Sequence, residues 1–281
     1  MGRSQAQILM SSRPTVGIVV PVRNMARTLE RSLQSACVQA PDRIVVVDDA
    51  SEDETPLVAA KFAEQFPFVE LVRWKQKQEC HVTALAPVYR ELGCDQVIGL
   101  SADDTLLPGL VDVVRDNAEH AVIFTNYSTE LVSDPSVKGV VEHPYKETTV
   151  LTPREMCERI RTQHPVETGI GSSLIRDVVQ WLWDNEWSEL GPHSDSVGYA
   201  TAAALFGCAY SPIYGAHIYF NPKGYGQSEA DKFPDLWAKR VREFAARVEL
   251  DAETCEALVQ KRCYYEIKEQ HWYQETENKD Q

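Results

Sequence analysis

The sequence has no apolar run long enough to cross a membrane. Its longest early apolar stretch, Gly17–Val22, has the length of a strand, whereas a membrane-spanning helix needs about 20 residues. Residues 1–12 carry Arg3 but no apolar segment of signal-peptide length, so we expect a soluble protein without an export signal. No Cys-x-x-Cys pair occurs among the seven cysteines, a pattern that indicates reduced thiols and a cytoplasmic location.

Positive charge is also scarce. The chain has 28 Lys and Arg against 42 Asp and Glu, giving a formal net charge of −14. Such a surface repels phosphate backbones and anionic lipids, which argues against nonspecific binding to nucleic acid or membranes. Lys239, Arg240, Arg242 and Arg247 cluster in one C-terminal segment, and we interpret them as the solvated face of a helix. A small anion bridged by a divalent cation remains compatible with this charge.

Two common phosphate-binding loops are missing. Pro21-Val-Arg-Asn24 follows the first apolar strand, where a dinucleotide fold would have Gly-x-Gly-x-x-Gly. The sequence also lacks Gly-x-x-x-x-Gly-Lys-Ser/Thr, the loop of P-loop enzymes. NAD, FAD and P-loop chemistry are therefore disfavoured, and carboxylates become the main candidates for function.

Strand and helix patterns alternate through the first half of the chain. Continuous apolar runs predict buried strands, and spacings of four residues, as in Leu29, Leu33 and Cys37, predict helices between them. Strands this apolar imply an α/β fold: a Rossmann-like, mostly parallel sheet flanked by helices. We expect strands at 15–22, 43–49, 68–73, 96–100 and 121–125. Capping boxes at Ser51 and Thr152 predict the starts of two helices, and a third helix should begin near Pro108. Further helices are expected over 82–92, 197–206, 233–248 and 253–271.

Polar residues follow three of these strands. They are Arg23-Asn24, Asp48-Asp49 and Asp103-Asp104. Because ligands of open α/β sheets bind beyond the carboxyl ends of the strands, this convergence predicts a ligand site. Each Asp pair can also be explained as a helix cap, although Ser51 already offers a cap after Asp48-Asp49. Oxygen ligands such as Asp103 and Asp104 suit Mg²⁺ or Mn²⁺.

These segments resemble family 2 glycosyltransferases of GT-A fold. The likeness rests on Thr15–Asn24, on Ile44–Thr55 and on Val97–Pro108, in that order and at these spacings. It is close over residues 15–115 and looser to about 228. It implies an N-terminal tail (1–14), a nucleotide-sugar-binding half (15–115), a half that binds the acceptor and carries the catalytic base (116–228), and a C-terminal helical extension (229–281).

The resemblance also implies roles for individual residues. Asp49 would accept a hydrogen bond from a uracil-type N3–H, supported by Asp48, and Asp104 with Asp103 would bind the metal, Asp104 chiefly. The family commonly has an acid where Ser101 stands, which puts the strength of metal binding in question. The family's Arg-Asn pair at the diphosphate is missing near Lys75–Ala86, so Arg23 or Lys223 would have to replace it. The expected donor-binding residues are Pro21, Val22, Arg23, Asn24, Asp48, Asp49, Ser51, Ala102 and Asp103.

The family's general base corresponds to Asp195, before the alanine-rich helix. A carboxylate there would take the proton of the attacking acceptor hydroxyl; the alternative is that Asp195 caps that helix. On the acceptor side we expect Gly171, Ser172 and His193, although an ordinary turn explains the first two equally well. Trp181, Trp183 and Trp187 are better explained by packing than by stacking on a sugar, and His217 by a structural role than by metal binding.

The resemblance therefore implies an inverting, metal-dependent glycosyltransferase of hexosyltransferase type. It would use Mn²⁺ or Mg²⁺ and move a sugar from a nucleoside-diphosphate sugar, a UDP-sugar by preference, to an acceptor hydroxyl that the sequence does not identify. A non-catalytic sugar-nucleotide-binding module is the main alternative, suggested by Ser101 and the missing Arg-Asn pair. A sugar-phosphate nucleotidyltransferase is less favoured because the loop after the first strand lacks glycines.

Overall fold

The computed structural model describes residues 13–78, 88–89, 91–162, 171–221 and 234–260. Its elements follow one another as β1 (Val16–Val22), α1 (Ala26–Cys37), β2 (Arg43–Asp48), α2 (Thr55–Gln65), β3 (Val69–Arg73), β4 (Gln96–Gly99), β5 (Thr105–Leu106), α4 (Leu110–Asp116), β6 (Val122–Leu131), β7 (Asp134–Val141), β8 (Thr149–Leu151), α5 (Pro153–Thr162), β9 (Ser173–Ile175), α6 (Arg176–Asp184), the 3₁₀ helix η2 (Trp187–His193), α7 (Ser194–Phe206), β10 (Cys208–Phe220) and α9 (Pro234–Arg247).

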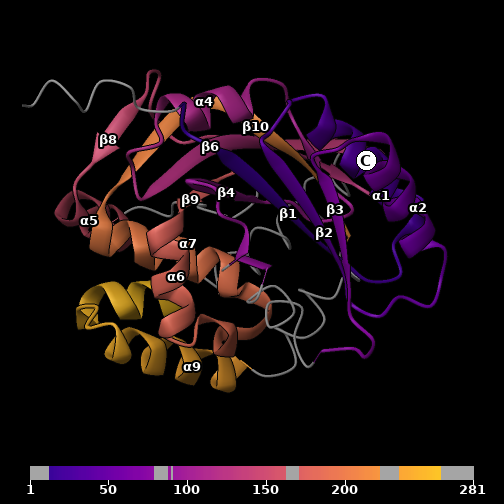
Figure 1. Cartoon of the computed structure of the whole chain (residues 1–281). Coiled ribbons are helices and arrows are strands. Elements are labelled where there is room, and N and C mark those ends of the chain that lie inside the picture. The colour runs from indigo at the N-terminus through magenta and orange to yellow at the C-terminus, as the bar shows by residue number, and fades with distance from the viewer. Residues whose placement is uncertain (1–12, 79–87, 90, 163–170, 222–233, 261–281) are drawn as a thin grey trace, which may run out of the picture.

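A ten-stranded sheet runs through the centre of the molecule (Figure 1). Its main path is β3-β2-β1-β4-β9-β6-β10-β5, with β7 beside β6 and β8 beside β10. Neighbouring pairs β1–β2, β2–β3, β1–β4 and β6–β10 are parallel, and β9 lies antiparallel between β4 and β6. The expected mostly parallel α/β sheet is confirmed, and the carboxyl ends of β1, β2 and β4 meet at one edge.

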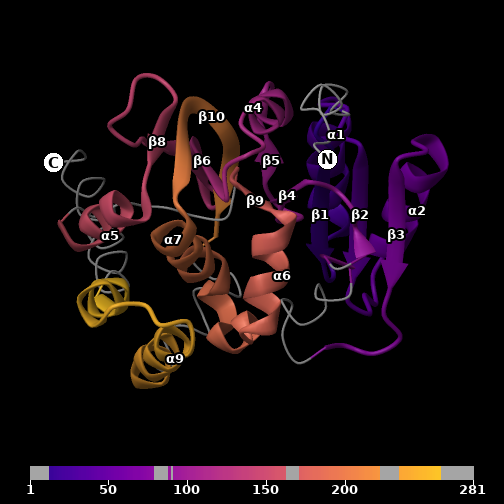
Figure 2. The same cartoon turned by 60° about the vertical axis from the view of Figure 1, so that its left-hand side comes forward.

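Helices cover both faces of this sheet, so the strands alternate between two apolar cores (Figure 2). Ile18 and Ile44 point toward α1, α2 and α4 and belong to one core. Val19 and Val45, one position further along, belong to the other core, toward α5, α6 and α7. This two-sided burial explains why the strands are apolar at every position and do not alternate between apolar and polar residues.

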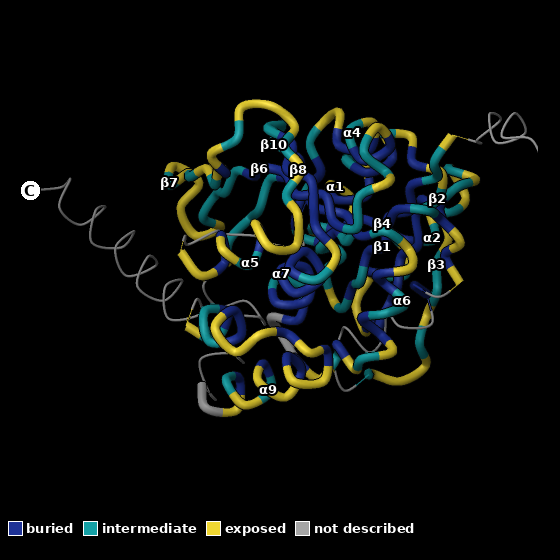
Figure 3. The backbone as a smooth tube through the Cα atoms, turned by 90° about the vertical axis from the view of Figure 1, so that its left-hand side faces the viewer, coloured by how far each residue is buried: buried dark blue, intermediate teal, exposed yellow. Residues whose placement is uncertain are grey.

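The C-terminal part adds a further layer below the second core. Trp237, Val241 and Phe244 of α9 are buried and join this core (Figure 3). Residues 252–260 are helical as well, which agrees with the start of the second amphipathic helix expected there. Within the described ranges no helix has the length and apolar character needed to span a bilayer.

The sequence located most elements of the first half but missed several of the second. Thr152 and Glu155 form the expected capping box, with the Thr152 amide donating to the Glu155 carboxylate at 2.8 Å. The box expected at Ser51 is wrong, since α2 begins at Thr55 and the Asp53 carboxylate accepts the Thr55 amide at 2.9 Å. Helix α4 starts at Leu110, two residues after Pro108, near where it was expected. The strands β5, β7, β8 and β10 were not anticipated, and most of the helix expected over 82–92 lies outside the described residues.

Candidate active site

Two tight turns lie side by side at the carboxyl ends of β1 and β2. Asn24 and Ala50 both have a φ angle of 53°, a left-handed conformation that is uncommon outside glycine. The Ser51 hydroxyl accepts a hydrogen bond from the Asn24 amide at 2.9 Å, and the Asn24 side-chain oxygen accepts one from the Glu52 amide at 2.8 Å. These reciprocal bonds fix the two turns relative to each other.

Arg23 adds a third connection between the same turns. Its Nη1 donates to the carbonyl oxygen of Asp49 at 2.7 Å and to that of Ala50 at 3.3 Å, and its Nη2 lies 3.4 Å from the Glu52 carboxylate. The guanidinium therefore holds the second turn, and these bonds give no support to its expected role at a diphosphate. Lys223, the other candidate for that role, lies outside the described residues.

Asp48 and Asp49 occupy different environments although they are adjacent. Asp48 is fully buried; its Oδ1 accepts the Ser51 amide at 3.1 Å and its Oδ2 lies 3.0 Å from Nε of Arg73. Asp49 is 6% exposed, and its Oδ1 accepts the backbone amide of Gln78 at 2.8 Å. Asp48 thus supports the turn, as expected, while Asp49 retains an oxygen that no described hydrogen bond uses. Arg73 was not singled out from the sequence.

Asp103 and Asp104 follow β4 at the same edge of the sheet. Asp103 is half-buried, whereas Asp104 is 3% exposed and its Oδ1 accepts the backbone amide of Tyr219 at 2.9 Å. Burial, together with the neighbouring Asp103 charge, raises the pKa of Asp104 to about 8, and burial also raises the pKa of Asp103. The more accessible member of the pair is Asp103, whereas the resemblance put the emphasis on Asp104.

The chemistry of this acid pair suits a divalent cation. Neither carboxylate forms an ion pair with a described Lys or Arg, and burial raises both pKa values although the nearby Arg31 charge lowers them, so a bound cation would relieve an unfavourable arrangement. The described residues contain no cluster of three His, Cys, Asp or Glu side chains able to ligate a metal. Mg²⁺ and Mn²⁺ commonly take only one or two carboxylates from the protein, with water and substrate phosphates completing their coordination.

Asp195 lies in the first turn of α7, one residue after the helix begins. The Asp195 Oδ1 accepts the backbone amide of Ser196 at 2.7 Å. Its negative charge contributes, after burial, to raising the pKa of Tyr89 and Tyr199, so Asp195 lies near these two tyrosines. Both hydroxyls lie against the carboxyl end of β4, because a Cβ added at Gly99 would be 3.6 Å from the first and 3.9 Å from the second. The base candidate and the acid pair therefore approach the same end of β4. The two tyrosines were not foreseen from the sequence.

A family model described as glycosyl transferase family 2 matches residues 17–176, more than half of the chain. The chain belongs to glycosyl transferase family 2. The matched region contains both β-strand turns and the Asp103-Asp104 pair, the segments on which the resemblance was based. A comparison with curated protein sequences gives no match for this glycosyltransferase.

Solved structures share its fold at low sequence identity. Residues 1–349 of TarS from S. aureus superpose with a TM-score of 0.59 at 18% identity, covering 86% of this chain and 71% of that one. The same TarS fragment in complex with UDP-GlcNAc gives 0.64 at 17%, covering 83% and 66%. The mannosyltransferase PcManGT from Pyrobaculum calidifontis, in complex with GDP-Man and Mn²⁺, gives 0.58 at 18%, covering 89% and 70%. The similarity confirms the expected GT-A fold.

Trp183 and Trp187 of this glycosyltransferase, two of the three tryptophans considered as sugar-stacking residues, are buried. Trp183 is 7% and Trp187 4% exposed, and their rings contact each other at 5.3 Å between centroids. The Trp187 indole nitrogen donates to the carbonyl oxygen of Ser194 at the start of α7, and Gly198 packs so closely that an added Cβ would lie 2.1 Å from that nitrogen. These two rings therefore hold the helix that carries Asp195 and are not surfaces for a sugar.

Two of the three expected acceptor-side residues, Gly171 and Ser172, are buried. Ser172 is 1% exposed, and Gly171, with a φ of 68°, packs against Thr125, whose hydroxyl donates to the Gly171 carbonyl at 2.6 Å. The turn interpretation explains both residues. His193 ends η2, but its side chain lies outside what the structure describes.

His217 on β10 lies beside the acid pair in the fold but bonds elsewhere. It pairs in register with Thr105, and its Nδ1 is 2.7 Å from the Ser128 hydroxyl while its Nε2 is 4.0 Å from the Glu130 carboxylate. Burial lowers its pKa, which disfavours the charged imidazolium. These contacts favour the structural interpretation of His217.

The basic residues of α9 are largely neutralised. Arg242 is bidentate to Glu256 at 2.6 and 2.8 Å, Arg247 bonds Glu186 at 2.9 Å, and Lys239 lies 3.6 Å from Glu243. Surface pairs of this kind leave little net positive potential for a polyanion. The expectation that this cluster is a solvated helix face agrees with these pairings.

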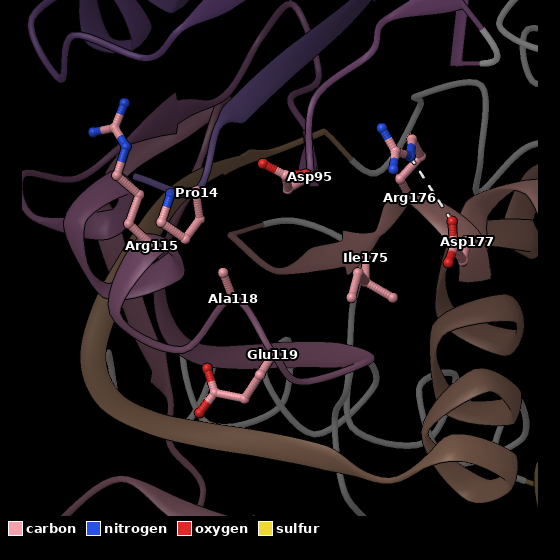
Figure 4. A pocket seen from close by; sticks show the side chains of 8 residues that line it. All are labelled: Pro14, Asp95, Arg115, Ala118, Glu119, Ile175, Arg176 and Asp177. Atoms are coloured by element: carbon pink, nitrogen blue, oxygen red, sulfur yellow. Dashed lines mark ion pairs between the residues drawn. The ribbon is translucent and has the colours of Figure 1, made fainter. Parts of the chain in front are cut away.

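A pocket of about 420 Å³ opens at the opposite edge of the sheet (Figure 4). Pro14 and Asp95 reach it from the amino ends of β1 and β4, and Arg115 and Arg176 lie on either side. The charges there are already engaged: Arg115 bonds Asp42 at 2.7 Å, and Asp95 accepts the Thr15 amide at 2.9 Å. None of the expected site residues lines this pocket.

Proposed function

We propose that this glycosyltransferase moves a sugar, with inversion at the anomeric carbon, from a nucleoside-diphosphate sugar to an acceptor hydroxyl. The observation that carries the proposal is the gathering of two acidic pairs at one sheet edge: Asp48-Asp49 at the end of β2 and Asp103-Asp104 after β4. To these we add Asp195, whose charge acts on Tyr89 and Tyr199 beside the end of β4. Open α/β sheets bind ligands at this edge.

The donor nucleotide is assigned to the turns after β1 and β2. Backbone from Pro21 to Asn24 is held rigid by Ser51 and Arg23, which provides a preformed surface for a planar base. Asp49 offers its second carboxylate oxygen to an N3–H donor, a contact that uracil makes and cytosine does not. The fold relatives include one with UDP-GlcNAc and one with GDP-Man. We favour a UDP-sugar because of Asp49.

We assign the divalent cation, Mn²⁺ or Mg²⁺, to the Asp103 carboxylate, with Asp104 behind it. Asp103 is the accessible acid, while the Asp104 carboxylate is buried and bonded to the Tyr219 amide. Bound there, the cation would neutralise charge on the departing nucleoside diphosphate. Mn²⁺ accompanies the relative PcManGT, which is consistent with this assignment.

Asp195 is assigned as the general base. The acceptor oxygen bonds to the anomeric carbon as the bond from that carbon to the diphosphate oxygen breaks; the acceptor proton passes to the Asp195 carboxylate, and the electron pair leaves with the diphosphate. The Ser196 amide, which donates to Asp195 Oδ1 at 2.7 Å, holds this carboxylate at the start of α7. Attack on the face opposite the leaving group inverts the configuration.

The test is Asp195→Asn, because it preserves shape while removing the proton acceptor. We expect UDP binding in the presence of Mn²⁺ to be unchanged and the transfer rate to fall by about 10²- to 10⁴-fold, the usual contribution of a general base. Asp184→Asn, at the end of α6, is the matched control and should leave both quantities unchanged. Transfer at the original rate by the Asp195→Asn protein would refute the assignment.

A further inference from the structure

The loop that carries the acid pair is fastened to helix α1 by three side chains. Ser32 Oγ donates to the Ser101 carbonyl oxygen at 3.0 Å, and Ser35 Oγ accepts the Leu106 amide at 3.0 Å. Arg31 makes the third connection, its Nη2 donating to the carbonyl oxygen of Asp103 at 2.7 Å. Residues 31, 32 and 35 lie on neighbouring positions of one helix face, so one rigid element holds both ends and the middle of the loop.

Arg31 is itself held in place by an aromatic ring. Its guanidinium carbon lies 3.4 Å from the centre of the Tyr219 ring, a close cation–π contact. Tyr219 is the residue whose backbone amide donates to Asp104 Oδ1. It is anchored in β10, where it pairs with Glu130 of β6. The same residue therefore fixes the Asp104 side chain by its backbone and the Arg31 guanidinium by its ring.

These contacts converge on the peptide group between Asp103 and Asp104. Its carbonyl oxygen is bonded to Arg31, and the Asp104 amide, its nitrogen, donates to the Ser101 carbonyl at 3.1 Å. A rotation of this peptide would redirect the Asp103 carboxylate. With the peptide held on both sides, the direction of that carboxylate is set by α1 and β10, before any ligand binds.

We propose that Arg31 is a positioning residue for the cation site, with the Tyr219 ring as its platform. Arg31 acts through the Asp103 carbonyl; it is neither a metal ligand nor a group that touches the sugar. The inference rests on the proposed function, since it assumes that Asp103 binds the cation. Groups that orient a metal ligand in this way typically change metal affinity by roughly 10- to 100-fold when they are removed.

The direct test is to measure Mn²⁺ binding by water proton relaxation at a fixed concentration of UDP. We expect Arg31→Ala to weaken Mn²⁺ binding by about tenfold, the lower end of the range for groups that orient a ligand. Arg31→Lys should recover part of this loss, because it restores a cationic donor without the planar face. Arg27→Ala is the matched control: Arg27 is exposed one turn earlier on α1, and its removal should change nothing.

Tyr219 gives an independent measurement. Tyr219→Phe keeps both the ring and the amide and should bind Mn²⁺ as the unmodified chain does. Tyr219→Leu keeps the amide bond to Asp104 but loses the ring, so it should reproduce part of the Arg31→Ala defect. Because the two residues act through one contact, the double variant should be weaker by less than the product of the single effects.

The Mn²⁺ dependence of the transfer rate distinguishes a positioning role of Arg31 from a general loss of structure. In Arg31→Ala the Mn²⁺ concentration for half-maximal activity should rise about tenfold, while kcat at saturating Mn²⁺ stays within about twofold, as expected for lost orientation of a ligand. Unchanged Mn²⁺ binding in Arg31→Ala, with binding intact in the unmodified chain, would overturn this inference alone. No Mn²⁺ binding by the unmodified chain would overturn the proposed function and this inference together.

Discussion

The Asp104→Asn substitution should change how the stability of the metal-free protein depends on pH. Burial raises the pKa of Asp104 to about 8 in the folded chain, whereas an unfolded Asp titrates near 3.9. Between these values the folded state holds a proton that the unfolded state has released. The stability that this carboxyl contributes is therefore complete below about pH 4 and is lost as the pH rises through 8.

The size of the effect follows from the separation of the two pKa values. Each pH unit within the window costs about 1.4 kcal/mol of unfolding free energy, so the loss between pH 4 and pH 7 is at most about 4 kcal/mol. Asn at position 104 can still accept the Tyr219 amide but cannot ionise. The unfolding free energy of Asp104→Asn minus that of the unmodified protein should therefore rise with pH and level off above about 8.

Urea unfolding in a chelating buffer at pH 4.5, 5.5, 6.5 and 7.5 measures this difference. Asp177→Asn is the control, since the Asp177 side chain is 90% exposed and its removal should give a difference that does not vary with pH. Mn²⁺ with UDP should reduce the pH dependence of the unmodified protein, because a cation stabilises the ionised carboxylate. A constant difference between Asp104→Asn and the unmodified protein across these pH values would refute the reasoning.

Three further outcomes test other parts of the molecule. Arg73→Ala should lower the unfolding free energy by about 1–2 kcal/mol. This is less than for a fully buried ion pair, because Arg73 is half exposed although its partner Asp48 is fully buried. Urea denaturation measures the change, and an unchanged unfolding free energy would show that Arg73 does not stabilise the turn. Gly198→Ala should cost about 1–3 kcal/mol through a clash with Trp187, and a melting temperature equal to that of the unmodified chain would contradict the packing described here. UDP with Mn²⁺ at about 100 times the dissociation constant should stabilise the chain by about 2.7 kcal/mol in a thermal-shift assay, whereas CDP should not match it if Asp49 reads N3–H.

The first half of the fold was predictable because its strands are buried on both faces. The strands Val16–Val22 and Arg43–Asp48 have no solvent-exposed face, so their sequences are continuous apolar runs that are easily assigned as strands. Each is followed by a short polar turn. The second half was not, since β7 alternates between exposed and intermediate positions at the sheet periphery and β10 is interrupted by register shifts near Tyr214. Strands of this kind depend on pairing partners that a local sequence window does not reveal.

The site showed the same division between local and distant information. Asp48-Asp49 and Asp103-Asp104 were visible because each pair lies at or shortly after the end of an apolar strand. Arg31, however, contacts Asp103 and Tyr219, which lie far from it in the sequence. No spacing pattern along the chain predicts these contacts. The same limit applied to exposure: the resemblance put the metal chiefly on Asp104, and only packing shows that this side chain is the more buried of the two.

The individual environments of the acids also change what the net charge of −14 means for a diphosphate ligand. Asp48 is paired with Arg73, Asp49 is bonded to a backbone amide, and the raised pKa of Asp104 keeps it mostly protonated at pH 7 without a cation. Asp103 is thus the accessible acid beside a carboxyl that resists ionisation. Cation binding would both add positive charge and favour release of the Asp104 proton, so the affinity for Mn²⁺ should increase with pH between about 6 and 8.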